Sequence, residues 1–116
     1  MTGETQFRTE LLIAGETRTD VAKLAGGTYY RGNPLVYDAG QYKYSATVEA
    51  EDATAIFLGD GVSDSTTIPL NGGLASILIW GDVFEAGIVN NSGAQLTITE
   101  NMRVAFRQNG FFVKRK

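Results

Sequence analysis

Apolar and polar residues alternate near the start of the chain, from Thr5 to Ile13. One side of this segment carries Phe7, Thr9, Leu11 and Ile13. A period of two is typical of a β-strand. The segment that follows, Gly15–Asp20, contains no apolar side chain. We therefore expect the opening strand to be detached from the body, as a flexible arm over residues 1–20 that precedes a single domain over residues 21–116.

A hairpin is predicted near the middle of the first half. Two β-prone runs, Leu35–Tyr37 and Gln41–Tyr44, flank Asp38-Ala39-Gly40. Three residues that end in glycine between two such runs indicate a hairpin, because glycine accepts the positive φ of a bulge.

Apolar runs farther along the chain predict buried strands. Ala55–Leu58 is bounded by Gly59, and Leu74–Trp80 follows a turn at Asn71-Gly72-Gly73. The second run is the strongest candidate for a core strand. Shorter pieces of strand are expected at Val83-Phe84, Ile88-Val89 and Phe111–Val113.

One segment predicts a helix. Thr97 and Glu100 have the spacing of a capping box, and Asn109-Gly110 supplies a stop signal. Met102, Ala105 and Phe106 fall on one helical face. We therefore predict a single short helix near the carboxyl terminus.

Composition limits the chemistry that this chain can perform. The 116 residues suit one domain with one core, and they include neither cysteine nor histidine. Disulfides and thiolate chemistry are excluded, and the commonest general base and metal ligand is missing. An enzyme is thus the least supported class. The first twelve residues contain Glu4, Arg8 and Glu10 and no long apolar run, so we expect no export signal and no membrane partner.

Charge is unevenly distributed along the sequence. No lysine or arginine lies between Lys43 and Arg103, whereas the residues after Glu100 include five cations and no acid. The net charge is −3, so the basic tail forms only a small footprint for nucleic acid, which is not an expected partner. The simplest explanation is a solvated acidic face and a basic tail. The alternative is that complementary acidic and basic patches orient copies of the chain, or a larger lattice, relative to one another.

No segment of the sequence matches a recognisable catalytic, metal-binding or phosphate-binding motif. Asp60–Asp64 lacks the ligand spacing of a calcium loop, and the acids of Glu49–Asp52 lie in a polar stretch without an apolar pocket. No glycine-rich segment has the pattern of a phosphate loop. We therefore assign no catalytic, cofactor or metal-binding residue.

Five tyrosines gather between residues 29 and 44, namely Tyr29, Tyr30, Tyr37, Tyr42 and Tyr44. They suit the half-exposed face of a sheet or a protein interface. The alternative is a stacking platform, which would make the chain a carbohydrate-binding or host-surface-binding β module.

Four segments together resemble the lambda-type bacteriophage head decoration proteins, also called capsid-stabilising or cement proteins. Gly27–Leu35 is similar to a family segment in which a glycine is followed, several residues later, by Arg-Gly-x-x-Leu. Ala55–Leu58 is similar to the family's Ala-x-Gly-Ile-Leu strand. Ile79–Val83 is similar to its Gly-Glu-Phe/Val turn, and Met102–Phe112 to its closing helix, Gly-Ile and strand. The resemblance runs from about Leu11 to Lys116.

The resemblance implies a non-enzymatic protein that binds the expanded phage capsid as a homotrimer at three-fold positions. Its partners would be further copies of itself and the major capsid protein, on the outer surface of a virion assembled in the host cytoplasm. The resemblance and the residue patterns together predict a mainly β (β-rich α+β) fold. The expected architecture is a small β-barrel or β-tulip-like domain with one short helix near the C-terminus and an extended N-terminal arm. The expected capsid contacts are Phe7, Thr9, Leu11 and Ile13. Possible trimer or lattice contacts are Tyr29, Tyr30, Arg31, Trp80 and Phe84.

Overall fold

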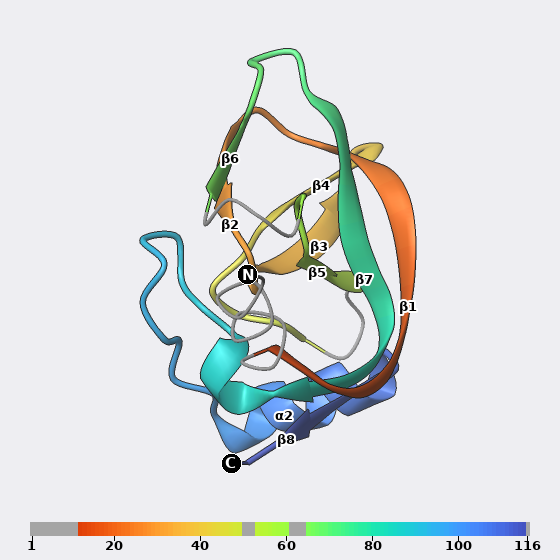
Figure 1. Cartoon of the computed structure of the whole chain (residues 1–116), viewed down its shortest axis with the longest axis vertical. Coiled ribbons are helices and arrows are strands. Elements are labelled where there is room, and N and C mark those ends of the chain that lie inside the picture. Colours follow the sequence, from red (N-terminus) through yellow and green to blue (C-terminus); the bar gives the residue numbers. More distant parts are fainter. Residues whose placement is uncertain (1–11, 50–52, 61–64, 116) are drawn as a thin grey trace, which may run out of the picture.

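The computed structural model describes residues 12–49, 53–60 and 65–115, and these residues form a mainly β fold with one short α-helix (Figure 1). This confirms the predicted fold class. The strands are β1 (Ile13–Leu24), β2 (Gly27–Tyr30), β3 (Pro34–Asp38), β4 (Gln41–Tyr44), β5 (Thr54–Phe57), β6 (Ser65–Ile68), β7 (Gly73–Phe84) and β8 (Phe111–Lys114). A 3-10 turn, η1, covers Glu85–Gly87, and helix α2 covers Glu100–Gln108.

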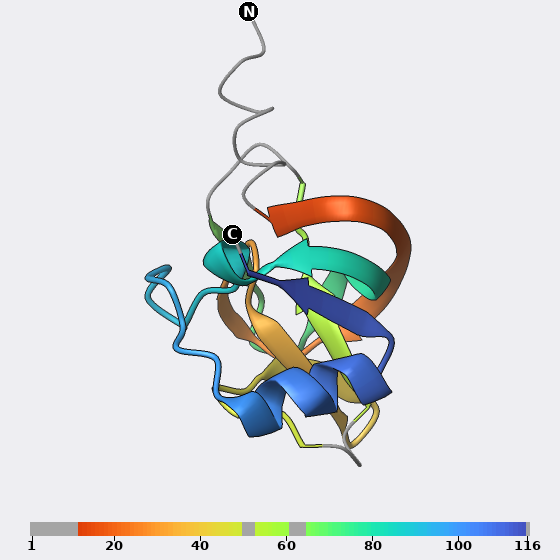
Figure 2. The same ribbon diagram turned by 90° about the horizontal axis from the view of Figure 1, so that it is seen from below.

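Five strands close into a small barrel. Hydrogen bonding follows the order β1-β4-β3-β5-β7, and β7 pairs again with β1. Each of these five strands therefore has a hydrogen-bonded neighbour on both sides, which covers the edges that would invite aggregation. Strand β8 extends the sheet beyond the barrel, parallel to the end of β7, while β2 and β6 form a separate ribbon. Figure 2 shows α2 lying beside β8, with β7 and β1 beyond it.

Strands β5 and β7 have an apolar core on each side, which is why the run Ala55–Leu58 is continuously hydrophobic. Ile56 is paired with Leu78, and Phe57 with Ile77. Because paired residues share a face and successive residues alternate, each pair enters a different core. The first core, toward α2, contains Leu12, Val48, Ile56, Leu78, Val83, Ile88, Met102, Ala105, Phe106 and Phe111. The second contains Leu24, Tyr29, Leu35, Ala55, Phe57, Ile68 and Ile77.

The predicted boundary of the arm at residue 20 is wrong. Leu12 is only 1% exposed in the first core, and the polar segment Gly15–Asp20 is part of β1. This strand pairs with β7 from Ile13 to Leu24 (Figure 1). Backbone hydrogen bonds to β7 hold it, so it needs few apolar side chains. The remaining arm residues, 1–11, lie outside the described part of the chain.

The predicted hairpin is confirmed as β3 and β4, with a tighter turn than expected. Asp38 pairs with Gln41, so the loop has two residues, Ala39 and Gly40, rather than three. Both have positive φ, 51° and 87°. Positive φ at both central positions is the geometry of a type I′ turn, whose twist matches that of the strands.

Strand β7 is longer than the sequence predicts, because Val83-Phe84 continues it past Gly81 instead of forming a separate piece. A Cβ at Gly81 would collide with the carbonyl oxygen of Glu16 on β1, so only glycine permits the two strands to pass this closely. Ile88-Val89 is not a strand; Val89 forms a single bridge to Gln95.

The predicted helix is confirmed, with a different cap. The hydroxyl oxygen of Thr99 accepts a hydrogen bond from the Met102 amide at 3.2 Å, so the cap is Thr99 rather than Thr97. The buried residues of α2 are Met102, Ala105 and Phe106, as its periodicity predicts.

Candidate functional site

An exposed aromatic pair lies where β7 meets β8. The rings of Trp80 and Phe112 are 6.5 Å apart and nearly perpendicular, and their residues are 39% and 44% exposed. Arg18, the pairing partner of Trp80 on β1, places its guanidinium carbon 5.7 Å from the centre of the tryptophan ring. Trp, Phe and Arg are enriched in protein interfaces, and Trp and Arg are also enriched at their energetic centres. We call Arg18, Trp80 and Phe112 the Trp80 surface.

The backbone beneath the Trp80 surface is shaped by a glycine. Gly110, between α2 and β8, has φ of 92°, and a Cβ there would lie 2.7 Å from Cδ1 of Trp80. The absence of a side chain lets the indole ring lie against the chain. The orientation of Trp80 is therefore set by backbone geometry as well as by Arg18 and Phe112.

An ion pair borders the same surface. Asp82 is in register with Phe112, and its carboxylate lies 3.5 Å from the ammonium nitrogen of Lys114. Half of the Lys114 side chain is exposed, so this pair contributes well under about 1 kcal/mol to stability. Its charges cancel locally, which leaves Arg18 as the cation at the centre of the Trp80 surface.

A second aromatic pair lies on the hairpin of β3 and β4, whose strand β4 pairs with the end of β1. The rings of Tyr37 and Tyr42 are 5.3 Å apart in an edge-to-face arrangement, and Tyr37 is 52% exposed. Burial raises the pKa of Tyr42, and the nearby carboxylate of Asp20 and the Tyr37 hydroxyl raise that pKa further. The charge of Asp20 thus acts on the Tyr42 hydroxyl.

The structure separates the residues that the sequence suggested as trimer or lattice contacts. Tyr29 cannot make such contacts, because it is 3% exposed, stacks on Phe57, and donates its hydroxyl hydrogen to the Ala25 carbonyl at 2.7 Å. Tyr30 is partly buried. Arg31 is also partly buried and donates to the Leu58 carbonyl at 3.0 Å.

Trp80 and Phe84 remain available in different degrees, since Trp80 is exposed and Phe84 is partly buried. Ile13, predicted in the arm, starts β1, pairs with Val83, and packs against the first core. Phe7, Thr9 and Leu11 lie outside the described residues. The sequence did not indicate Arg18 or Phe112 as surface contacts; only the alternation of Phe111 with Phe112 could have suggested that one of them points outward.

The five tyrosines do not share one surface. Tyr29 lies inside the second core, and Tyr42 and Tyr44 pack partly against that core. Tyr30 belongs to the separate ribbon of β2 and β6. Only Tyr37 is strongly exposed. The stacking platform suggested by their proximity in sequence is therefore not assembled from all five.

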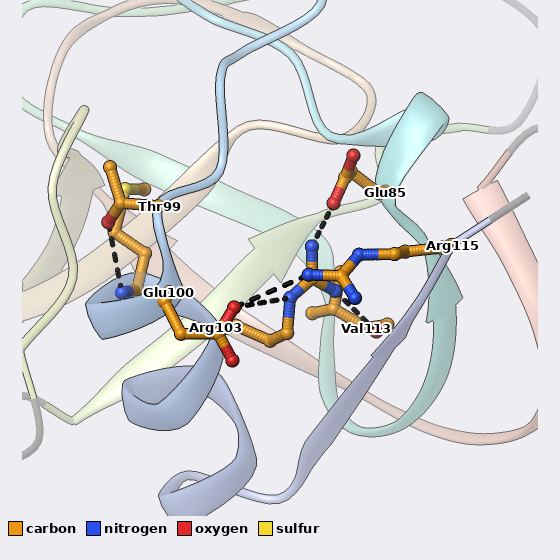
Figure 3. A network of polar contacts seen from close by, with 7 residues as sticks. Glu85, Thr99, Glu100, Arg103, Val113 and Arg115 are labelled. Carbon is orange, nitrogen blue, oxygen red and sulfur yellow. Dashed lines mark hydrogen bonds and ion pairs between the residues drawn. The ribbon is translucent and has the colours of Figure 1, made fainter.

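A charged network holds α2 against its neighbours (Figure 3). Arg103 donates to the carboxylate of Glu85 and, at 2.8 Å, to the carbonyl oxygen of Val113 in β8. Glu100 lies 3.8 Å from Nε of Arg103 and accepts from Arg115 at 3.3 Å. The Arg103 side chain is only 12% exposed, and it joins η1, α2 and β8. We assign this network a structural role.

The acidic segments considered for chemistry do not form a site in the described residues. Glu49 and Asp60 are exposed, and the rest of Glu49–Asp52 and of Asp60–Asp64 lies outside those residues. A hollow of about 310 Å³ is lined by Glu85 and residues 95–98, but Arg103 already engages that carboxylate. Across residues 12–49, 53–60 and 65–115, no group of three or more acidic side chains is placed to hold a metal ion.

Comparison with known proteins does not add a relative. No protein-family model matches the chain, and no curated protein sequence matches it. Within the described part of the chain, none of the helices has the length and apolar character needed to cross a bilayer. The Trp80 surface, with Asp20 two residues from Arg18 on β1, is the candidate functional site that the geometry itself supplies.

Proposed function

We propose that this chain is a non-enzymatic structural protein that binds the expanded head of a bacteriophage as a homotrimer at three-fold positions and stabilises the shell. The observation that carries the proposal is the Trp80 surface, an exposed aromatic pair with a stacked arginine on a small closed barrel. This composition is that of a protein-binding centre. The order of the four segments that resemble head decoration proteins supports the same conclusion.

The amino-terminal segment supplies the second part of the proposal. The chain enters the first core at Leu12, so residues 1–11 precede the barrel. In a β-strand conformation Phe7, Thr9 and Leu11 would share one side, because they alternate in the sequence, and this pattern suits addition to a sheet edge of the major capsid protein. Three such segments on one trimer would bind cooperatively, because the first attachment raises the effective concentration of the others.

The test is co-sedimentation of the purified full chain with expanded lambda-type heads that lack their own decoration protein. We expect the full chain to pellet with the heads and to raise the temperature at which they release DNA. A chain with Phe7 and Leu11 changed to Ser should bind far more weakly, whereas the matched change of Gln6 and Glu10 to Ser, on the other side of the alternating segment, should have little effect. Equal binding by both variants would contradict the role of the segment, and no binding by the full chain would contradict the function.

A further inference from the structure

Arg18 is an exposed residue, and the described residues leave the hydrogen-bond donors of its guanidinium group unused. It contacts the face of Trp80, but it forms no hydrogen bond or ion pair with any residue in 12–49, 53–60 or 65–115. A guanidinium presents five donors in a planar fork that matches a carboxylate. The Trp80 surface therefore fits a partner that offers a carboxylate beside an apolar side chain.

Such a combination exists two residues farther along the same strand. Asp20 is exposed, and one of its carboxylate oxygens accepts a hydrogen bond from the Val21 amide at 2.8 Å. No described cation pairs with it. The Asp20 carboxylate acts on the hydroxyl of the partly buried Tyr42, one of the causes that raise the pKa of Tyr42, and the Tyr42 ring contacts the exposed ring of Tyr37.

Arg18 and Asp20 lie on the same face of β1. The irregularity in pairing near Arg18 arises on β7, where Ile79 is the extra residue between Leu78 and Trp80. Strand β1 therefore keeps its alternation, and residues two positions apart share a face about 6–7 Å apart. Opposite charges, each with aromatic neighbours, thus stand side by side on one exposed surface.

We infer that this surface binds a second copy of the chain, with Arg18 of one copy paired to Asp20 of the next and the Trp80 surface packed against the partner's Tyr37. The inference rests on the self-association in the proposed function and names the residues that perform it. In a ring of three copies every contact is head-to-tail, so different residues of two neighbouring copies meet at each contact. Arg18 and Asp20 are adjacent and opposite in charge. Each interface therefore gains one ion pair, between Arg18 of one copy and Asp20 of the next, and avoids contact between like charges.

The test uses charge reversals in the full chain, followed by sedimentation velocity over a range of protein concentrations. Arg18→Asp and Asp20→Arg should each raise the dissociation constant of the assembly by about tenfold or more, a common size for loss of a charge pair at an interface. The double reversal R18D/D20R should restore assembly, because every contact then contains the same pair with its charges exchanged. A role confined to folding of β1 predicts no such rescue.

Lys23→Asp supplies the matched control. Lys23 is an exposed cation of the same strand, but it lies an odd number of residues from Arg18 and so occupies the opposite face. Its reversal should leave the assembly intact. Trp80 is the only tryptophan in the sequence, so its fluorescence should shift to shorter wavelength as the wild-type chain associates, and this shift should return in the double reversal.

Three outcomes would overturn the inference: a wild-type chain that stays monomeric at all concentrations tested, single reversals that assemble normally, or a folded double reversal that does not assemble. Head binding separates this inference from the proposed function. A chain that assembles through Arg18 and Asp20 but does not bind heads contradicts the function alone. A chain that binds heads as an assembly insensitive to both reversals contradicts the inference alone.

Discussion

The side-chain nitrogen of Asn33 donates a hydrogen bond to the carbonyl oxygen of Val89 at 3.0 Å, across 56 positions of sequence. The same nitrogen donates to the carbonyl of Asn90 at 2.8 Å, and the amide oxygen accepts from the backbone of Tyr30 at 2.7 Å. Asn33 is fully buried. It thereby connects the turn between β2 and β3 to the segment that follows η1.

Replacement of Asn33 by Ala should lower the free energy of unfolding by about 2–4 kcal/mol, because the Val89 carbonyl and the Tyr30 amide lose their side-chain partner and the Asn90 carbonyl keeps only its bond from Gly93. The midpoint of urea unfolding, with the slope compared between variants, measures the change. Asn91→Ala is the control, since Asn91 is exposed, and it should change stability by less than about 0.5 kcal/mol. Equal effects of the two substitutions would show that the Asn33 contacts carry no net stability.

Thr99→Ala should destabilise the protein by about 1 kcal/mol, the usual cost of removing a helix cap. The hydroxyl oxygen of Thr99 accepts from the amide of Met102, whereas Thr97, which the sequence suggested as the cap, lies before the helix begins. Thr97→Ala should therefore change stability much less. Thermal unfolding of the two variants side by side distinguishes the two caps, and a larger loss for Thr97→Ala would reverse the assignment.

Ala39→Gly should stabilise the hairpin of β3 and β4. Ala39 has φ of 51°, a left-handed conformation that costs an L-residue about 1–2 kcal/mol. Glycine removes that cost but adds entropy to the unfolded chain, so the net gain should be about 0.5–1 kcal/mol. Ala46→Gly, in an exposed loop where φ is not positive, provides the comparison and should destabilise. A loss of stability in Ala39→Gly would contradict the turn geometry.

Stability should fall at high pH partly through Tyr29. Burial raises the pKa of its hydroxyl above the ordinary value of 10.0. The unfolded chain therefore releases this proton first, so the contribution of Tyr29 is complete below about pH 10 and is lost as pH rises toward the folded pKa. Tyr29→Phe should flatten the decline of stability with pH in this range.

At neutral pH the same substitution should cost about 1 kcal/mol, because the hydrogen bond to the Ala25 carbonyl disappears. Urea unfolding between neutral and alkaline pH measures both effects. Tyr42→Phe should act in the same direction, since burial also raises the pKa of Tyr42. An unchanged alkaline decline in the Tyr29→Phe protein would contradict the assignment.

The strands and the helix with strong apolar patterns could be predicted. The run at Ala55–Leu58, the run at Leu74–Trp80 and the helix containing Met102 and Phe106 each carry their own burial signal. Strand β1 could not be recognised from Gly15–Asp20, because its polar residues are held by backbone bonds to β7. Side-chain periodicity does not report backbone pairing with a distant strand.

The candidate site depended still more on tertiary structure. Tyr29 and Tyr37 are similar in sequence context, yet one fills a core and the other is half exposed. Arg18 belongs to the Trp80 surface only because β1 places it over the Trp80 ring. Phe112 belongs to it because β8 lies beside β7. These are contacts between segments separated by more than thirty residues, which local patterns do not encode.

The sequence by itself determined the mainly β class, the short closing helix, the type of turn residues and the absence of thiol and imidazole chemistry. Those properties follow from residue identity and from local periodicity, which are fixed before any two distant segments meet. Tertiary structure alone decided where the folded body begins, which aromatic side chains are covered, and that Arg18, Asp20 and Trp80 share one surface. The physical reason is that burial depends on closure of the barrel through β1 and β7, and closure is a property of strand pairing over long sequence distance.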